Sequence, residues 1–201
     1  MVSNNINNSQ RDEKELLAGL KRGEDRAYRQ LVRKYQAKLV NIAYGITLDK
    51  EESLDIVQDV FLKVFTGINR FEGKSALYTW LRRITINESL NWRRKWKRRF
   101  RWHHQSIDNE EQGTLRELGT SETGPERTYQ KKELEKILNK GLNMLPDKAR
   151  TVLILKELEG LSYEEIGTIL KIKKGTVSSR VFYAREKLRE YLEDFKNGVD
   201  D

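Results

Sequence analysis

Residues that suit contact with a nucleic acid lie near the carboxyl end of the chain, on one face of a predicted helix. Beginning at Thr176, apolar residues recur at helical spacing and mark the buried side of that helix: Val177, Val181, Ala184, Leu188 and Leu192. The outward side then carries Ser178, Ser179, Phe182, Tyr183, Glu186 and Arg189. An exposed Phe beside Ser, Tyr and Arg suits base edges and thymine methyl groups better than it suits water. This face therefore predicts contact with DNA.

A second, shorter helix is expected directly before this one. Ser162 and Glu165 have the spacing of a capping box, and Leu161 and Ile166 occupy the staple positions that flank it. Residues 161–185 are therefore typical of a helix, a tight turn and a second helix, the arrangement that places one helix in a DNA groove. An ordinary helical hairpin is the alternative, but the capping box together with the outward-facing set favours DNA binding.

A basic and aromatic segment lies earlier in the chain. All 4 tryptophans fall between residues 80 and 102, and residues 93–101 are almost wholly cationic. Trp92, Trp96 and Phe100 are spaced four residues apart, so on a helix they form one aromatic ridge flanked by positive charge. Such a surface binds phosphates and can stack on bases. The alternative is a solvated basic face whose aromatic rings dock on the rest of the domain.

Composition narrows the class of protein. The 201 residues include 39 Lys and Arg against 31 Asp and Glu, a net charge of +8 that favours a polyanionic partner such as nucleic acid. The chain has 0 cysteines, and its 2 histidines, His103 and His104, are adjacent, so no metal site and no cofactor is expected. Neither a membrane helix nor an apolar signal core is visible, which predicts a cytoplasmic protein without membrane insertion.

The periodicity predicts an all-α protein with two small helical domains joined by a flexible acidic linker. Residues 1–10 are Asn-rich and expected to be disordered. Residues 11–102 are expected to form a four-helix domain. Its first helix starts at Asp12, with Glu15 as capping partner. Asp49 and Glu52 have the same spacing at the start of the third helix, and the fourth helix begins near Leu77. Residues 103–128 form the linker, 129–195 the second domain and 196–201 a tail.

Five stretches of sequence together resemble one protein family. They are residues 55–61, residues 71–84 followed by Asn87 and Asn91, and residues 145–147, 161–166 and 175–185. Their order and separation resemble the extracytoplasmic-function (ECF, group 4) sigma factors of bacterial RNA polymerase, within the sigma-70 family, over nearly the whole chain. The resemblance implies that residues 11–102 are sigma region 2 and residues 129–195 are sigma region 4. It implies a polymerase subunit that directs transcription initiation by reading minus 35 and minus 10 promoter elements and melting DNA.

The resemblance also assigns roles in the first domain. Asp55, Gln58 and Asp59 match the family's contact with core polymerase, and they share one helical face; without the family, a solvated polar face would be the default. The minus 10 set comprises Phe71, Lys74, Ser75, Arg83, Asn87, Asn91, Arg94 and Arg98. In this set Phe71 is expected to stack on a flipped base, the Asn amides to read base edges and the arginines to hold the backbone. Trp80 is expected in the core instead.

The minus 35 set is Thr176, Ser178, Ser179, Arg180, Phe182, Tyr183 and Arg185. Thr176, Arg180 and Arg185 match positions that mostly hold phosphates, whereas Ser179, Phe182 and Tyr183 match positions near bases. Ser178 and Tyr183 stand where relatives often have basic residues, so the base preference does not transfer. Lys171 stands where the turn commonly has Gly, which predicts a modest conformational cost.

The implied partners are core RNA polymerase, promoter DNA as duplex and as melted non-template strand, and an anti-sigma factor. The acidic linker resembles the connector that threads the polymerase channel, although a plain solubilising tether would have the same composition. A helix-turn-helix regulator that binds duplex DNA alone is the competing function, but it leaves the basic helix and the acidic linker unexplained. No catalytic constellation can be assembled from the residues, so an enzyme is not expected.

Overall fold

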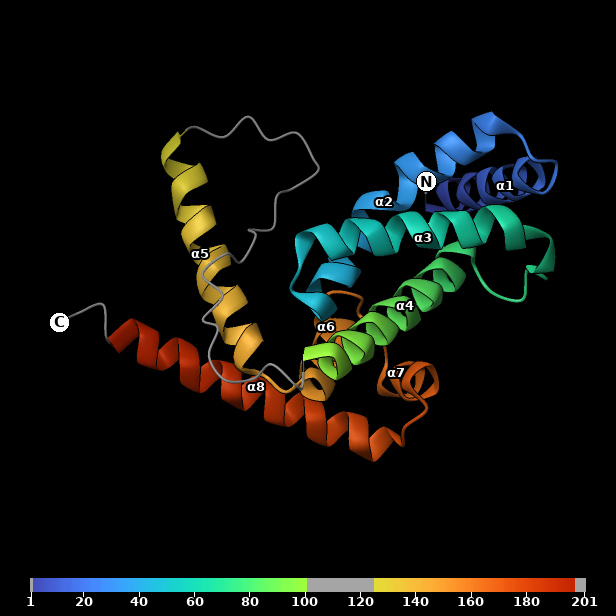
Figure 1. Ribbon diagram of the computed structural model, residues 1–201. Helices are drawn as coiled ribbons and strands as arrows, with labels where there is room; N and C mark the ends of the chain where they lie inside the picture. The colour runs from blue at the N-terminus through green and yellow to red at the C-terminus, as the bar shows by residue number, and fades with distance from the viewer. Residues whose placement is uncertain (1, 101–124, 198–201) are drawn as a thin grey trace.

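The computed structural model describes residues 2–100 and 125–197, with side chains for residues 11–99 and 133–196. Every regular element in these ranges is helical, as predicted (Figure 1). The elements are α1 (Val2–Lys21), α2 (Asp25–Thr47), α3 (Lys50–Gly67), a short 3₁₀ helix (Ile68–Arg70), α4 (Leu77–Phe100), α5 (Pro125–Met144), α6 (Asp147–Glu157), α7 (Tyr163–Leu170) and α8 (Lys174–Asn197). The part of the predicted acidic linker that precedes residue 125 lies outside the described residues.

The first helical unit packs α2, α3 and α4 around one apolar core (Figure 1). Each helix buries a stripe of aliphatic side chains at helical spacing, because that spacing brings them to one side. The stripes include Leu31, Leu39 and Ile42 of α2, Val57, Val60 and Val64 of α3, and Leu77, Leu81 and Ile86 of α4. Asp49 caps α3 as predicted, since its side chain accepts a hydrogen bond from the Glu52 N–H at 3.0 Å.

The amino-terminal helix differs from the prediction. It begins at Val2, so Asp12 is no N-cap and residues 2–10 are helical, not disordered. Residues 2–11 contain neither Pro nor Gly, so the helix propagates backward from the turns anchored by buried Leu16 and Leu20. The Glu13 carboxylate accepts a hydrogen bond from the Leu77 N–H at 2.5 Å, which ties α1 to the start of α4.

The second helical unit consists of α5 to α8 (Figure 1). Val177, Val181 and Ala184 of α8 are buried as predicted. Leu192 is 39% exposed, because the last turns of α8 extend beyond α6, so its predicted place in the core is wrong. Helix α5 begins at Pro125, inside the predicted linker, which fits the preference of proline for the first helical position. At the other end, α8 continues to Asn197, inside the predicted tail.

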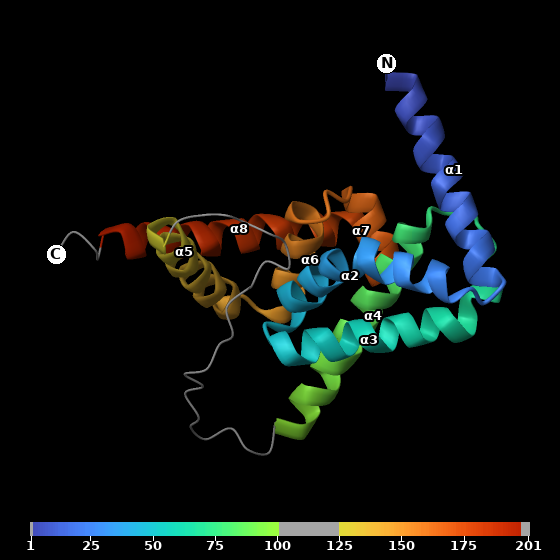
Figure 2. The ribbon, with the colours of Figure 1, turned by 90° about the horizontal axis from the view of Figure 1, so that it is seen from above.

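The two units pack against each other through α2 and α6, as the view from above shows (Figure 2). Gly45 of α2 lies flush against Ile154 of α6, where a Cβ atom would come 2.9 Å from the Ile154 Cγ2 atom. Only glycine permits this approach. Buried residues of both units, among them Ile46 of α2 and Val152 of α6, belong to one contiguous apolar cluster. The described helices therefore form one closed arrangement.

Candidate nucleic-acid interfaces

Local hydrogen bonds fix both ends of α7, the first helix of the helix-turn-helix, and the Ile172 N–H closes the turn after it by donating to the Gly167 carbonyl at 2.9 Å. Ser162 and Glu165 form the predicted capping box: the Glu165 N–H donates to Ser162 Oγ at 3.2 Å, and the Ser162 N–H donates to Glu165 Oε2 at 2.8 Å. Lys171 ends α7 in the left-handed conformation, with φ 56° and ψ 47°, so the conformational cost predicted for a non-glycine residue is present. Gly167 lets the turn close, because a Cβ atom there would lie 2.8 Å from the Ile172 carbonyl oxygen.

The outward face of α8 is arranged as predicted. Phe182 is 69% exposed and Tyr183 is 43% exposed, although both are large aromatic residues. Ser178 and Ser179 are exposed beside them, and Thr176 and Arg180 are half-buried. Burying such rings against a partner is favourable, because it removes apolar surface from water. The helix thus presents an aromatic and hydroxyl surface of the size that a major groove admits.

Cations near this face are already paired with carboxylates of the same unit. Arg185 donates to Glu157 Oε1 from Nε at 3.0 Å and from Nη2 at 2.6 Å. This pair raises the pKa of Arg185. Lys174 pairs with Glu164 at 2.5 Å between Nζ and Oε1. Two cations are therefore held in place in the free chain, and phosphate oxygens can take the positions of the carboxylates.

Helix α4 presents a second polar face. Arg83, Asn87, Arg94 and Arg98 are exposed and Asn91 is half-buried, and their spacing places all five on one side of the helix. The Arg94 guanidinium donates to the Asn91 side-chain oxygen. This face combines amide groups, which can read base edges, with guanidinium groups, which hold phosphates. The structure therefore brings together five of the eight residues predicted for the minus 10 element.

The loop before α4 places Phe71 differently from the solvent-facing position that base stacking requires. Phe71 is 6% exposed and packs against Trp80, with ring centroids 5.0 Å apart. The Phe71 N–H donates to the Ile68 carbonyl at 3.0 Å, which ends the 3₁₀ helix with the ring directed into the core. Phe71 is thus a core residue in this structure, and its stacking on a flipped base stays a prediction. Lys74 and Ser75 remain exposed on the loop.

The aromatic ridge of α4 docks on its own unit. Trp92 and Trp96 are half-buried with ring centroids 6.2 Å apart, and Trp92 packs against the core of the first unit. The Arg93 guanidinium lies 5.5 Å from the centroid of the Trp96 ring. The side chain of Phe100 lies outside the described residues. The alternative of docked aromatic rings therefore holds for Trp92, whereas Trp96 contacts Trp92 and Arg93 of the same helix.

Helix α3 carries the predicted polar face and an apolar surface beside it. Asp55, Gln58 and Asp59 are all exposed. Next to them a groove of about 680 Å³ runs between α2 and α3, and Leu62 and Phe65 on its rim are 63% and 58% exposed. Exposed aliphatic and aromatic side chains beside acidic ones are typical of a protein-binding surface. The exposure of Phe65 was not predicted from the sequence. It could have been predicted, because Phe65 is an apolar residue on the polar side of the predicted helix.

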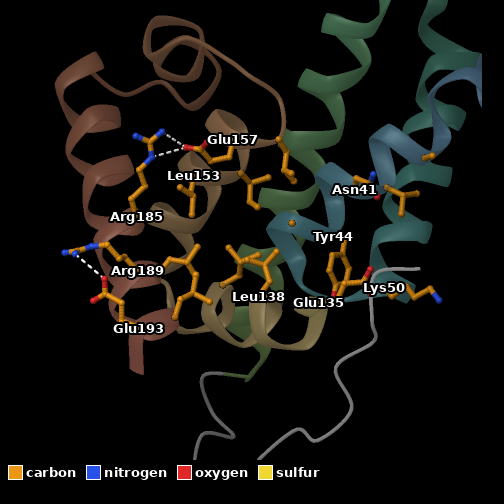
Figure 3. Close-up of a pocket in the computed structure, with 18 of the residues that line it drawn as sticks. Asn41, Tyr44, Lys50, Glu135, Leu138, Leu153, Glu157, Arg185, Arg189 and Glu193 are labelled. Carbon is orange, nitrogen blue, oxygen red and sulfur yellow. Dashed lines mark hydrogen bonds and ion pairs between the residues drawn. The ribbon is translucent and has the colours of Figure 1, made fainter. Parts of the chain in front are cut away.

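A larger groove of about 1370 Å³ opens between the two units (Figure 3). Tyr44 and Lys50 line the side of the first unit, and Leu138, Leu153 and Arg185 line the side of the second. Burial, followed by the negative charge of Glu135, raises the pKa of Tyr44 to about 12, so its hydroxyl stays neutral at physiological pH. The groove is thus lined by apolar side chains together with charged ones.

Among the residues that the structure describes, no three His, Cys, Asp or Glu side chains lie together as metal ligands would. None of the described helices combines the length and apolarity required to cross a membrane.

An all-helical chain with a helix-turn-helix on one unit and an amide and guanidinium face on the other belongs to the class of DNA-binding transcription proteins. Residues 31–99 match the family described as Sigma-70 region 2, and residues 136–188 match Sigma-70, region 4. The chain belongs to the sigma-70 family and is an ECF-type sigma factor.

Similar proteins support this membership. The RNA polymerase sigma-H factor of Pseudomonas aeruginosa is 34% identical over 189 residues, which cover 92% of this chain and 96% of that protein. The ECF RNA polymerase sigma-E factor of Escherichia coli strain K12 is 33% identical over 177 residues, which cover 86% of this chain and 90% of that protein. The chain therefore matches these relatives over nearly their whole length.

Solved structures show the same arrangement of helices. The sigma factor RpoE from Bartonella quintana, solved in complex with the anti-sigma factor NepR, matches with a TM-score of 0.62 at 27% identity, over 83% of this chain and 96% of that chain. CnrH, solved in complex with the cytosolic domain of CnrY, matches with a TM-score of 0.60 over 90% of this chain and 97% of that chain. Its identity is 21%, so this second likeness concerns the fold alone.

Proposed function

We propose that this sigma factor binds core RNA polymerase in the cytoplasm, directs it to promoters and helps to separate the DNA strands, without covalent chemistry of its own. The observation that carries the proposal is the presence of two separate exposed polar faces on helices of different units. Helix α8 presents Phe182 and Tyr183, and α4 presents Asn87 beside arginines. A regulator that binds one duplex site needs only the first of these faces, so the duplex-only alternative is not favoured.

The face of α8 is proposed to read the minus 35 element as duplex. Ser179, Phe182 and Tyr183 would meet base edges, and Thr176, Arg180 and Arg185 would hold the backbone. Ser178 lies beside them on the same exposed surface. The helix-turn-helix supports this reading, because the tight turn at Gly167 and Ile172 and the ion pair of Glu164 with Lys174 join α7 to α8.

The face of α4 is proposed to hold the minus 10 element as a melted strand. Asn87 and Asn91 would read unpaired bases, while Arg83, Arg94 and Arg98 bind the phosphates. Lys74 and Ser75 would meet the strand on the neighbouring loop, where Gly73 has φ 72°. Binding the single strand more tightly than the duplex favours melting, and this difference in affinity supplies the free energy.

The acidic and apolar surface of α3 is proposed to contact the polymerase. Asp55, Gln58 and Asp59 would provide polar contacts, and Leu62 and Phe65 would bury apolar area at the same interface. Such a combination of an apolar centre with a polar rim is typical of stable interfaces.

Transcription from a defined template tests the function as a whole. Full-length chain and purified core polymerase should yield a specific transcript from a linear promoter found by mapping start sites after overexpression. A template with its minus 10 segment already mismatched should need less help in strand separation. Specific duplex binding by the chain, combined with failure to associate with core polymerase or to start transcription on either template, would favour the duplex-only regulator.

We also propose that an anti-sigma factor is a partner, and that it occupies the groove between the units. RpoE was solved with such a partner, and the groove here has apolar lining residues that suit a helix with one apolar face. Leu138 projects toward this groove (Figure 3) and is 39% exposed. An inhibitor isolated with the full chain from its own cells should lose affinity for Leu138→Asp and retain it for Lys140→Asp, an exposed position on the same helix. Equal affinity for both variants would place the inhibitor elsewhere.

A further inference from the structure

Helix α4 begins without a capping side chain of its own. The Trp80 N–H donates to the Ala76 carbonyl at 3.3 Å, so Ala76 occupies the N-cap position, where alanine is unfavourable because its side chain accepts no hydrogen bond. A carboxylate of another helix supplies an acceptor instead: Glu13 Oε1 of α1 accepts from the Leu77 N–H at 2.5 Å. Leu77 is fully buried, so leaving this N–H unpaired would be costly.

The register of α1 directs Glu13 toward the start of α4. Glu13 shares one face of α1 with Leu16 and Leu20, because the three residues recur at helical spacing. Both leucines are buried, and Glu13 itself is half-buried, whereas Glu15 on another face is exposed. Two anchored leucines therefore hold the Glu13 carboxylate against the rest of the first unit.

A second observation places the charge of Glu13 beside the first turn of α4. Tyr35 of α2 is buried, and its ring stacks on the ring of Tyr78 of α4 with centroids 5.7 Å apart. Burial raises the pKa of Tyr35, and the negative charge of Glu13 raises it further. A carboxylate is favourable at this place, because the amino end of a helix carries partial positive charge.

The capped end of α4 is also one end of the loop proposed to meet the minus 10 strand. Residues 72–76 are exposed throughout, between buried Phe71 and buried Leu77. Phe71 ends the 3₁₀ helix and anchors the first end of the loop, and Glu13 anchors the second through the Leu77 N–H. Inside the loop the Lys74 side chain is 85% exposed, so it adds little to the position of the backbone. The position of the loop therefore depends mainly on its two anchored ends.

We infer that Glu13 is a positioning residue for recognition of the minus 10 element. By capping α4 from α1, it fixes the end of the loop that carries Lys74 and Ser75, and with it the first turn of the helix that carries Asn87. Its carboxylate holds these groups in place and does not itself bind the strand. This inference rests on the proposed function of the α4 face.

A carboxylate that only competes with phosphate would behave differently. The amino end of a helix attracts anions, so removing a mere competitor would strengthen binding of the strand. Glu13→Gln keeps an oxygen acceptor for the Leu77 N–H without the charge, and Glu13→Ala keeps neither. A positioning role predicts that Glu13→Gln retains most of the affinity and that Glu13→Ala loses it. Competition predicts a gain for both variants.

Holoenzyme assembled from the full-length chain and core polymerase provides the test. The probes are a single-stranded oligonucleotide with the non-template minus 10 sequence and a duplex with the minus 35 element, both from a mapped promoter. Glu13→Ala should lower affinity for the single strand on the order of three- to tenfold, because fewer molecules hold the loop in its binding position. Affinity for the duplex should not change. The matched control, Glu15→Ala, removes the same charge from an exposed position of α1 and should alter neither affinity.

A local cap tests whether Glu13 acts through the start of α4. Ala76 is exposed and serine is a favourable N-cap residue, so Ala76→Ser introduced into Glu13→Ala should restore part of the affinity for the single strand. Glu13→Asp keeps the charge but is one methylene shorter, so it should lose affinity as well. Thermal unfolding of each chain shows whether the first unit is folded, and Glu13→Asp replaces Glu13→Ala in the comparison if the latter does not fold.

The outcomes separate this inference from the proposed function. Parent-like affinity of Glu13→Ala for the single strand would overturn the positioning role, and so would a gain in affinity by both Glu13→Ala and Glu13→Gln. Equal loss on the two probes, without recovery by Glu13→Gln or Ala76→Ser, would show a general defect and overturn it too. Failure of the parent holoenzyme to prefer the minus 10 strand over a scrambled strand would instead overturn the proposed role of the α4 face.

Discussion

Arg185 of α8 and Glu157 of α6 are joined by two hydrogen bonds to a single carboxylate oxygen, at 2.6 and 3.0 Å. The guanidinium is therefore oriented in the free chain, and a phosphate that took the place of Glu157 would meet donors already in position. Because both side chains are about half exposed, the pair itself adds little to stability. We expect the pair to affect the affinity of Arg185 for DNA instead.

Replacing Arg185 with Ala should weaken binding to every sequence alike and lower the salt dependence by about one counterion. Glu157→Gln should act in the opposite direction at low salt, because the carboxylate that competes with phosphate is lost. Binding of the full chain to one duplex with the minus 35 element and one without it, at several salt concentrations, checks both variants. A change in sequence ranking for Arg185→Ala would contradict a backbone role.

Replacing Tyr183 with Arg should change which minus 35 bases are preferred. Tyr183 is 43% exposed beside Phe182 on the outward face of α8, the face proposed to meet base edges. The salt slope should change only by the amount that one added charge explains. Selection from a promoter library at two salt concentrations measures both. If the ranking of sequences stays the same, base reading belongs to Ser179 and Phe182.

The sequence was informative wherever the signal is local. The Ser162–Glu165 capping box, the Asp49 cap and the left-handed Lys171 depend on residues within a few positions, and all three are present in the structure. The burial of Phe71 was not predicted, because an aromatic residue in a loop gives the same sequence signal whether its ring points into the core or into solvent. Only the contact with Trp80 distinguishes the two cases.

The contacts between the units could not be predicted from the sequence. Asp147 and Arg93 are 54 positions apart, and Tyr78 and Glu159 are 81 apart, so no periodic pattern relates them. Each residue taken alone resembles an ordinary member of a polar helix surface. Their pairing depends on how α2 packs on α6, which is decided by the shape of Gly45 and its neighbours.

Phe71 and Asn87 should now behave differently when each is replaced with Ala. Phe71→Ala leaves a cavity in the core and should cost roughly 3 to 5 kcal/mol of stability, with equal loss of transcription on matched and mismatched templates. Asn87→Ala should leave stability within about 0.5 kcal/mol, because the side chain is exposed. It should reduce open-complex formation by roughly 1 to 3 kcal/mol per lost base contact. Thermal unfolding beside transcription on both templates makes the comparison.

Reversing Asp55 and Asp59 to Lys should abolish association with core polymerase while the helical circular dichroism stays unchanged. Leu62→Ser and Phe65→Ser should weaken association too, since their apolar area would no longer be buried. Lys21→Glu on α1 serves as an exposed control away from α3. Undiminished core binding by the Asp55 and Asp59 double variant would rule out this surface as the polymerase contact.

The contacts of Asp147 with Arg93 and Lys97 of α4 should weaken in acid. Burial raises the pKa of Asp147, but the hydrogen bonds from Arg93 and Lys97 outweigh it, so the pKa of this carboxyl is lowered. A lowered pKa means that the stabilisation is fully present above the unfolded pKa of about 3.9 and is lost as pH falls through the folded value. The difference in the free energy of unfolding between the parent chain and Asp147→Asn should therefore be constant from pH 7 to about 5 and vanish in stronger acid. A difference that persists at pH 2 would exclude the charge of Asp147 as its cause.

The residue at position 45 determines how tightly the first unit packs against the second. A glycine inside a helix costs roughly 0.5 to 1 kcal/mol relative to alanine, so α2 is weaker than it need be at the place where the second unit rests. Adding a methyl group there would strengthen the helix and push Ile154 away, so that the first unit gains stability while the pair of units loses contact. Larger side chains at position 45 would push the two units progressively farther apart. Such a series of variants would therefore vary the strength of packing between the units without changing any charge.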